Sequence, residues 1–160
     1  MKTQIFILFF LPMITFSQTA DDYFRLAYNS TDNQEKIDNY TRCLKIEPYN
    51  TVAYYNRARI YQKLGNYKDA ITDFTSAIRV DPDYAIAYND RGIIYANLEN
   101  YQEAIADFTR AIRISPDYAN AYLNRGIAKE AQGLYYCKDY KKACVLGDKE
   151  SCEWYSDKCE

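Results

Sequence analysis

Four cysteines near the carboxyl end carry the clearest chemistry of this 160-residue chain. Cys137 and Cys144 are seven residues apart, as are Cys152 and Cys159, so each pair would share one face of a helix. Gly147 lies between the two segments and suits a turn that makes them antiparallel. Paired positions in such a hairpin have a constant sum of residue numbers, which selects Cys144–Cys152 and Cys137–Cys159 from three possible disulfide pairings. A four-cysteine zinc site is the alternative, although such sites usually have C-x₂₋₄-C spacing.

Catalytic groups are scarce. The chain has no histidine, which removes Ser-His-Asp and Cys-His arrangements and histidine metal ligands. No glycine-rich phosphate loop is found. Aspartates recur, each following an arginine at nearly constant spacing, and we interpret these pairs as contacts between two helices. The pairs are Arg57 with Asp73, Arg91 with Asp107, and Arg125 with Asp139. The sequence therefore predicts no enzyme, no metal and no cofactor.

A block of 34 residues occurs twice in succession, at 51–84 and 85–118. This period is typical of helix-turn-helix solenoids. In the first copy Ala70, Phe74 and Ala77 recur every three or four positions, which places them on one helical stripe. Most of the 18 tyrosines also follow the period, so we interpret them as packing residues. The pattern predicts an all-α array that presents an extended groove instead of an enclosed reaction pocket.

The first copy resembles the signature of the tetratricopeptide repeat (TPR) family. The matching residues are Tyr54, Ala58, Tyr61, Leu64, Gly65, Tyr67, Ala70, Phe74, Ala77 and Pro82. Glu99 replaces the turn glycine in the second copy, and a third copy matches if the turn between its helices is shorter. Upstream, only Tyr40, Cys43 and Pro48 match. The resemblance implies a right-handed TPR superhelix with a C-terminal capping helix, and we expect Cys43 to be a packed thiol.

The amino terminus resembles an export signal. Met1-Lys2 precedes a short apolar run from Ile5 to Phe16, which is too short for the roughly 20 apolar residues of a membrane-spanning helix. We expect an exported chain, periplasmic or extracellular, with no membrane insertion after cleavage, and disulfides persist in such compartments. The expected organisation is a signal peptide at 1–17, a degenerate repeat at 21–50, repeats at 51–84 and 85–118, an atypical repeat at 119–148, and a disulfide-stapled capping helix at 149–160.

In the TPR family the first helix of each repeat lines the concave surface. The resemblance implies partner-binding roles there for Tyr55, Asn56, Arg59, Lys63, Asn89, Asp90, Asn97 and Asn124. Asn56 and Asn124 match the asparagine column that grips a peptide backbone in some TPR proteins, while Asp90 interrupts it. An amide donates and accepts at once, which suits a peptide backbone. The alternative is that these residues form a solvated helix face. The chaperone-binding carboxylate clamp is not matched, since its positions are held by Tyr55 and Arg59, or by Asn89 and Ile93.

The charge balance limits the classes of partner that the chain can be expected to bind. The formal net charge is −2 and the isoelectric point is about 5.3, with no basic stripe, which argues against nucleic acid and anionic membrane surfaces. The leading hypothesis is a non-catalytic adaptor that binds a peptide or partner protein in its concave groove. The alternative is a structural subunit of an envelope or secretion assembly. Binding or hydrolysis of cell-wall fragments is a weaker idea that rests on fold analogy alone.

Overall fold

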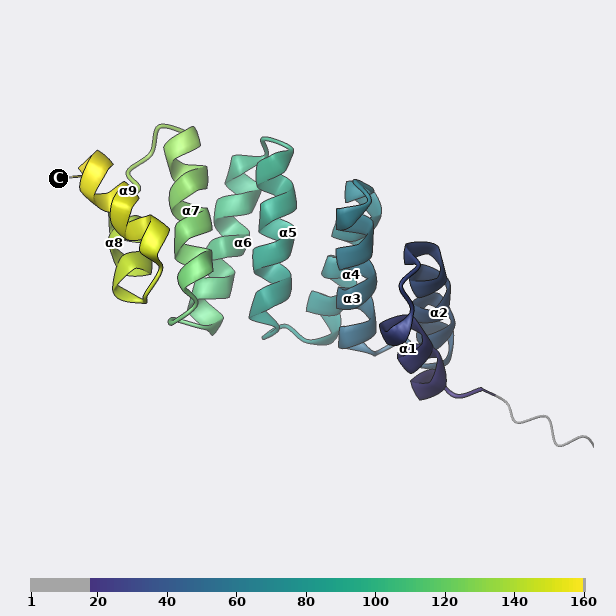
Figure 1. Cartoon of the computed structure of the whole chain (residues 1–160). Coiled ribbons are helices and arrows are strands. Elements are labelled where there is room, and N and C mark those ends of the chain that lie inside the picture. Colours follow the sequence, from purple (N-terminus) through teal and green to yellow (C-terminus); the bar gives the residue numbers. More distant parts are fainter. Residues whose placement is uncertain (1–17, 160) are drawn as a thin grey trace, which may run out of the picture.

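The computed structural model describes residues 18–159, and all the regular structure within them is helical. The helices stand side by side in chain order, with α1 and α2 at one end of the row and α8 and α9 at the other (Figure 1). Their bounds are α1 Ala20–Asn29, α2 Asn33–Ile46, α3 Thr51–Lys63, α4 Tyr67–Val80, α5 Ala85–Asn97, α6 Tyr101–Ile114, α7 Ala119–Ala131, α8 Cys137–Val145 and α9 Lys149–Cys159. The predicted all-α solenoid is confirmed.

The predicted signal peptide at 1–17 lies outside the described residues. None of the helices in the described part of the chain has both the length and the apolar character needed to cross a membrane.

Local sequence explains where several helices begin and end. Asp32 and Asn50 cap α2 and α3 by accepting hydrogen bonds from backbone N–H groups of the first turn. The turn between α3 and α4 places Gly65 at φ 76°, and the equivalent turn between α5 and α6 places Glu99 at φ 60°. Glu99 therefore adopts the same left-handed conformation, which is less favourable for a residue with a Cβ. The second repeat thus keeps the left-handed turn although Glu99 replaces the glycine.

The third repeat departs from the prediction of a shorter turn. Residues 132–136 form a longer connection than the three residues between α3 and α4, and α8 is the element that is shortened. Gly133 at φ 69° ends α7, because a left-handed residue cannot continue a right-handed helix. The chain then becomes helical again only at Cys137. Compared with α4, helix α8 therefore lacks its first turn.

Aromatic rings pack between the two helices of each repeat. Phe74, Phe108 and Tyr140 are fully buried at equivalent positions of α4, α6 and α8. A Cβ added to Gly92 would lie 2.8 Å from the Phe108 ring, and one added to Gly126 would lie 2.5 Å from Tyr140. Because both distances are too short for real contacts, these glycines allow the paired helices to approach closely.

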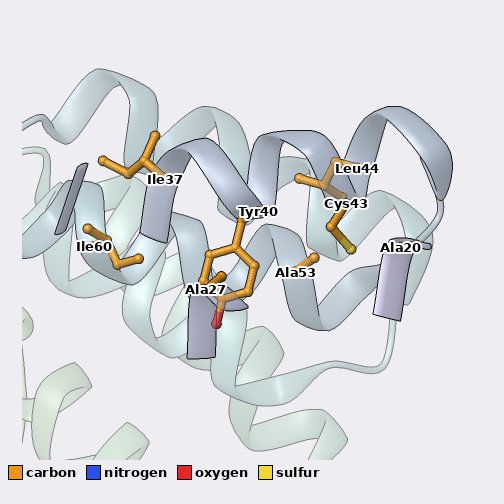
Figure 2. Close-up of a cluster of buried hydrophobic side chains, with 8 residues drawn as sticks. All are labelled: Ala20, Ala27, Ile37, Tyr40, Cys43, Leu44, Ala53 and Ile60. Carbon is orange, nitrogen blue, oxygen red and sulfur yellow. The ribbon is translucent and has the colours of Figure 1, made fainter. Parts of the chain in front are cut away.

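The first helical pair keeps the 34-residue register even though few of its side chains match the repeat signature. Helix α2 begins and ends 34 residues before α4. Tyr40 stands 34 residues before Phe74 and takes its place in a buried cluster with Ala27, Ile37 and Cys43 (Figure 2). Cys43 is a free cysteine and is fully buried, and burial raises the pKa of its thiol. It is therefore a packed, protonated side chain.

The last two helices form a covalently closed hairpin. Disulfides join Cys137 to Cys159 and Cys144 to Cys152, which is the nested arrangement. Trp154 packs edge-on against Tyr140, with ring centroids 5.5 Å apart. The Tyr140 hydroxyl donates to Glu130 at 2.6 Å, and burial together with this carboxylate raises the tyrosine pKa. The cap is thus tied to α7 by packing and hydrogen bonds and closed on itself by sulfur.

Candidate partner-binding surface

The recurring arginine–aspartate pairs lie between helices and serve the fold. Arg57 donates two hydrogen bonds to Asp73, of 2.7 and 2.8 Å, and a third of 2.8 Å to Thr41 of the preceding repeat. Arg91 repeats this arrangement with Asp107 and Thr75. The three pairs are largely buried. The geometry matches the predicted contact between the two helices of each repeat.

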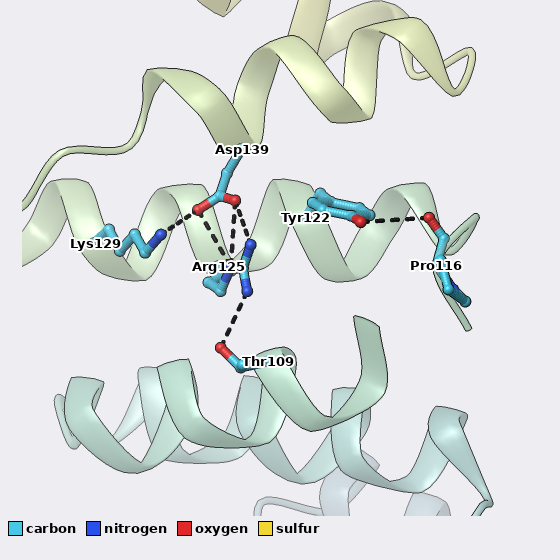
Figure 3. Close-up of polar contacts among 6 residues, drawn as sticks. All are labelled: Thr109, Pro116, Tyr122, Arg125, Lys129 and Asp139. Carbon is cyan, nitrogen blue, oxygen red and sulfur yellow. Dashed lines mark hydrogen bonds and ion pairs between the residues drawn. The ribbon is translucent and has the colours of Figure 1, made fainter. Parts of the chain in front are cut away.

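The third pair contains an additional cation. Asp139 accepts from Arg125 at 2.6 Å and from Lys129 at 2.7 Å, while Arg125 also donates to Thr109 (Figure 3). Lys129 occupies the position at which the earlier repeats have Tyr61 and Tyr95. The ammonium group therefore replaces an aromatic packing contact with a second ion pair to the same buried carboxylate.

A chain of hydrogen bonds crosses the first helices of three successive repeats. The Tyr55 hydroxyl of α3 donates to Asp90 of α5 at 2.9 Å. The Asn89 amide donates to the other oxygen of Asp90 at 3.1 Å, and the Asn124 amide of α7 donates to Asn89 at 2.9 Å. Helix α5 also contacts α7 directly. These links mark the side on which first helices meet each other, and we call the row Tyr55–Asp90–Asn89–Asn124 the polar chain.

The polar chain changes the roles of two predicted site residues. Tyr55 and Asn89 are 6% and 3% exposed, so their side chains are used by neighbours within the protein. The Tyr55 ring packs against Phe74 and Tyr84. Burial, and then the charge and hydrogen bond of Asp90, raise the pKa of Tyr55. The sequence predicts that Asp90 interrupts the row of amides. In the structure Asp90 accepts hydrogen bonds from Tyr55 and Asn89 and joins α3 to α5.

A pocket of about 480 Å³ lies beside the polar chain, where α1, α2 and α3 meet. Three cations line it, Lys36, Arg59 and Lys63, together with the amides Asn33, Asn56 and Gln62 and the side chains of Tyr28, Tyr40 and Ile60. The lining contains no carboxylate. We call this the N-terminal pocket. Its charge and size suit a polar, anionic group rather than an apolar one.

The structure brings some predicted site residues together and separates others. Asn56, Arg59 and Lys63 share the N-terminal pocket, and the Arg59 guanidinium lies 5.9 Å from the centre of the Tyr55 ring. Asn97 is exposed at the last position of α5, apart from both groups. Asn124 is half-buried at the end of the polar chain. Across residues 18–159, no three or more His, Cys, Asp or Glu side chains are placed to hold a metal ion.

Sequence reasoning missed the contributions of the first helical pair. Lys36 and Asn33 stand 34 residues before Ala70 and Tyr67, two signature positions of the first clear repeat. Ala70 and its counterpart Ala104 are fully buried, whereas Lys36 is partly exposed in the pocket. The sequence does contain a signal for the pocket, because Lys36 and Asn33 replace an alanine and a tyrosine of the signature while the 34-residue register is kept. A poor match to the signature does not by itself show that such replacements line a pocket.

Comparison with known proteins agrees with this architecture. Residues 55–119 match the tetratricopeptide repeat family. No curated protein matches the chain in sequence. A crystal structure of MamA has a TM-score of 0.77 at 24% identity, over 83% of this chain and 81% of that one, and shows the fold alone.

Two further solved structures are TPR domains. The Arabidopsis OM64 TPR domain has a TM-score of 0.65 and 25% identity, and the match covers 69% of this chain and 94% of that domain. The first TPR of Spaghetti (RPAP3), bound to the HSP90 peptide SRMEEVD, has a TM-score of 0.61 and 28% identity, over 71% of this chain and 87% of that one.

The fold is an α-α solenoid, a class of repeat protein that presents an extended helix-lined surface suited to binding other proteins. More closely, residues 55–119 match the tetratricopeptide repeat family, and the repeat period and the two TPR domains among the structural neighbours agree with that match.

Proposed function

We propose that this chain is a non-catalytic interaction module that holds an extended peptide or a segment of a partner protein along α3, α5 and α7. The observation that carries the proposal is the polar chain, in which Tyr55, Asp90, Asn89 and Asn124 hold one another across three helices. A surface ordered before binding loses less conformational entropy when a partner arrives. The peptide complex of the Spaghetti TPR supports this use of the fold.

Exposed and half-exposed side chains would make the contacts. Asn97 and Asn120 are exposed on α5 and α7, and Asn124 is half-buried. Amides of this kind pair with the N–H and C=O groups of an extended backbone without requiring a particular side-chain sequence. Tyr55 and Asn89 support the surface from beneath, since their polar atoms are already bonded. The function is therefore recognition of a segment, with no bond made or broken.

The same proposal includes export. Two disulfides close the C-terminal hairpin, and disulfides persist in oxidising compartments such as the periplasm or the extracellular space. In protein isolated from its natural compartment and unfolded in denaturant, so that the buried Cys43 can react, we expect mass spectrometry with a thiol-reactive reagent to count one free cysteine before reduction and five afterwards. A count of five before reduction would contradict export into an oxidising environment.

The test of the groove compares a surface variant with a matched control. The groove variant carries Asn97→Ala, Asn120→Ala and Asn124→Ala, whereas the control carries Gln34→Ala, Gln102→Ala and Gln132→Ala. Each removes three amides, and those of the control lie outside α3, α5 and α7 and are exposed. Proteins captured from the native compartment by the wild type should be lost with the groove variant and retained with the control. Equal recovery by all three would remove the groove from the proposal.

A further inference from the structure

We propose that the N-terminal pocket receives a carboxylate-bearing part of the partner, so that the protein selects acidic segments and holds their acidic portion at α1–α3. This inference rests on the proposed peptide-binding function and names the chemistry of the partner. It depends on the charge of the pocket, on the way the pocket is formed, and on its position at one end of the groove.

The charge of the pocket is unbalanced. Lys36, Arg59 and Lys63 line it, and within residues 18–159 none of the three forms an ion pair. The nearest carboxylates along α2 have other partners. Asp32 accepts from the Glu35 backbone N–H, and the Glu35 side chain accepts from the Ser30 hydroxyl.

Asp38, further along α2, accepts from Gln34 on the same helix. Across the groove, Asp90 of α5 accepts from Tyr55 and Asn89. Each of these four acidic groups thus has a hydrogen-bond donor of its own, while the three cations of the pocket form no ion pair within residues 18–159. An incoming carboxylate would supply a counter-charge.

The pocket exists because the first pair departs from the repeat signature. Where Ala70 and Ala104 pack the second helix closely against the following one, α2 has Lys36, whose long side chain cannot be buried in that way. Asn33 replaces the tyrosine of the same helical end. Space and charge therefore appear together at the α2–α3 junction, in place of the apolar contact found in the next two repeats.

The lining also suits the stem of an acidic side chain. Tyr40 is buried at the floor, and Tyr28 stands 70% exposed at the rim. Asn56 contributes an amide, and the first residue of α2, Asn33, brings the positive end of that helix dipole to the pocket. Aromatic surface can cover methylene groups while the amides and cations bind the carboxylate oxygens.

The position of the pocket gives the groove a direction. Arg59 belongs to the pocket and also lies over the Tyr55 ring, at the start of the polar chain. The next charged group along that chain is Asp90, which repels acidic residues. Ile127 on α7 is partly exposed further along. An acidic portion is therefore favoured at α1–α3 and disfavoured from α5 onward.

The experiment uses short fluorescent peptides with acetylated and amidated ends that contain four consecutive Glu, Gln or Lys residues. A fourth peptide has the Gln sequence with a free terminal carboxylate, which separates a terminal from a side-chain source. The pocket variant carries Lys36→Gln, Arg59→Gln and Lys63→Gln. A charge-matched control carries Lys68→Gln, Arg113→Gln and Lys142→Gln, three exposed cations outside the pocket.

We expect the wild type and the control to bind the Glu peptide roughly tenfold more tightly than the Gln peptide, with a preference that falls as salt is added. The pocket variant should bind both equally. A gain for the free-terminus peptide alone would identify a terminal carboxylate as the bound group. Equal affinity of the wild type for the Glu peptide, the amidated Gln peptide and the free-terminus peptide, or equal loss in both variants, would overturn the inference.

The proposed function can be judged separately. If natural partners are lost with the groove variant of Asn97, Asn120 and Asn124 but retained in full by the pocket variant, the groove function stands and the acidic selectivity is wrong. If the groove variant loses nothing, the function itself fails, whatever the peptides show. Circular dichroism of each variant checks that the helices are intact before either comparison is made.

Discussion

Single residues hold several helices at once in this protein. Arg57 of α3 contacts Asp73 of α4 and Thr41 of α2, so one guanidinium links two repeats. Burial lowers the pKa of Arg57, but the hydrogen bond and charge of Asp73 outweigh this effect and raise it above the usual value. The arginine therefore stays charged and depends on Asp73 to offset the cost of its burial.

Asp73→Asn is expected to destabilise the fold by about 3 kcal/mol, because it leaves a buried guanidinium without its counter-charge. Chemical denaturation followed by circular dichroism measures the change. Asp69→Asn, an exposed carboxylate on the same helix, is the control and should cost less than about 0.5 kcal/mol. Binding of a captured partner should be nearly unchanged in both. A larger loss of binding than of stability in Asp73→Asn would show that this carboxylate has a direct role in recognition.

The sequence predicts such residues unequally well. Arg57 and Asp73 could be paired because their spacing recurs with the period, whereas the bond to Thr41 reaches back into a repeat that barely matches. Tyr55 and Asn89 both donate to Asp90, which belongs to a neighbouring helix in the case of Tyr55 and is the next residue in the case of Asn89. A match to a position of the family signature indicates on which face of a helix a residue lies. It does not indicate whether a neighbouring side chain covers that residue, as happens at Tyr55 and Asn89.

At the scale of elements, the spacing within each repeat is set by one small position facing one ring. Ala58, Gly92 and Gly126 occupy this column, and Gly126 leaves the least room, since an added Cβ would lie 2.5 Å from Tyr140. Tyr140 is also held by Glu130 and Trp154. The ring therefore has little freedom to move away from a larger residue.

Gly126→Ala is expected to destabilise α7 and α8, since overpacking costs about 1–3 kcal/mol and the gain in helix propensity returns at most about 1 kcal/mol. Gly92→Ala should cost less, because the added methyl group would stand 2.8 Å from Phe108 and the first repeat already accommodates alanine at this position. Thermal unfolding of the two variants measures the order. Equal or greater stability of Gly126→Ala would show that Tyr140 moves freely.

The α8–α9 hairpin is stabilised by its cross-links as well as by packing. Its inner disulfide closes a separation of 8 residues, for which the chain-entropy model gives about 2.5 kcal/mol. Cys144→Ser combined with Cys152→Ser should lower the local stability of α8 and α9 by about this amount and leave α3–α6 unchanged. Hydrogen exchange resolved by segment measures both effects. Uniform loss of protection along the chain would contradict a local role.

The elements themselves were largely predictable, because period, stripe and turn residues agree over 51–118. The exceptions have physical causes. Gly133 ends α7 and the following segment does not re-form a helix until Cys137, so the shortening falls on α8 and not on the turn. The first pair keeps its register, although its side chains give little sign of it. The register depends on the spacing of the helices along the chain, whereas the signature residues are needed for packing between repeats. A terminal repeat packs against a neighbour on one side only, so it needs fewer signature residues.

At the scale of the whole molecule, buried and half-buried tyrosines make the free energy of unfolding depend on pH in the alkaline range. Burial is the main cause that raises the pKa of six tyrosines. They are Tyr40, Tyr55, Tyr61, Tyr84, Tyr118 and Tyr140. A raised folded-state pKa favours the neutral phenol, so its stabilising effect is complete below the unfolded value of about 10 and declines as the pH rises above it.

The melting temperature should therefore fall as the pH is raised from about 9 to 11, and tyrosinate absorbance should rise together with the loss of helix. Tyr135→Phe, which removes an exposed phenol, should leave this profile unchanged. Tyrosinate absorbance that reached its full value before any helix was lost would show that these phenols ionise in the folded state.

The whole-chain arrangement was predictable and the place of its pocket was not. Period and family resemblance indicate an array of helices with one exposed groove, and the structure has that array. The pocket requires knowing that Lys36 leaves space beside α3, whereas Ala70 leaves none beside α5. The sequence alone cannot say which departure from a signature opens a space and which is filled by a neighbour.

The two ends of the row are secured differently. Within residues 18–159 both disulfides lie in the α8–α9 hairpin, while α1 and α2 depend on non-covalent contacts with α3. An array with only nearest-neighbour contacts opens first at its weaker terminus. Thermal fluctuation would therefore detach the amino-terminal pair before any other, and the three cations would then no longer face a common space. A guest bound among them would suppress this fraying, so occupancy of the pocket would determine how long the amino-terminal pair stays attached to α3.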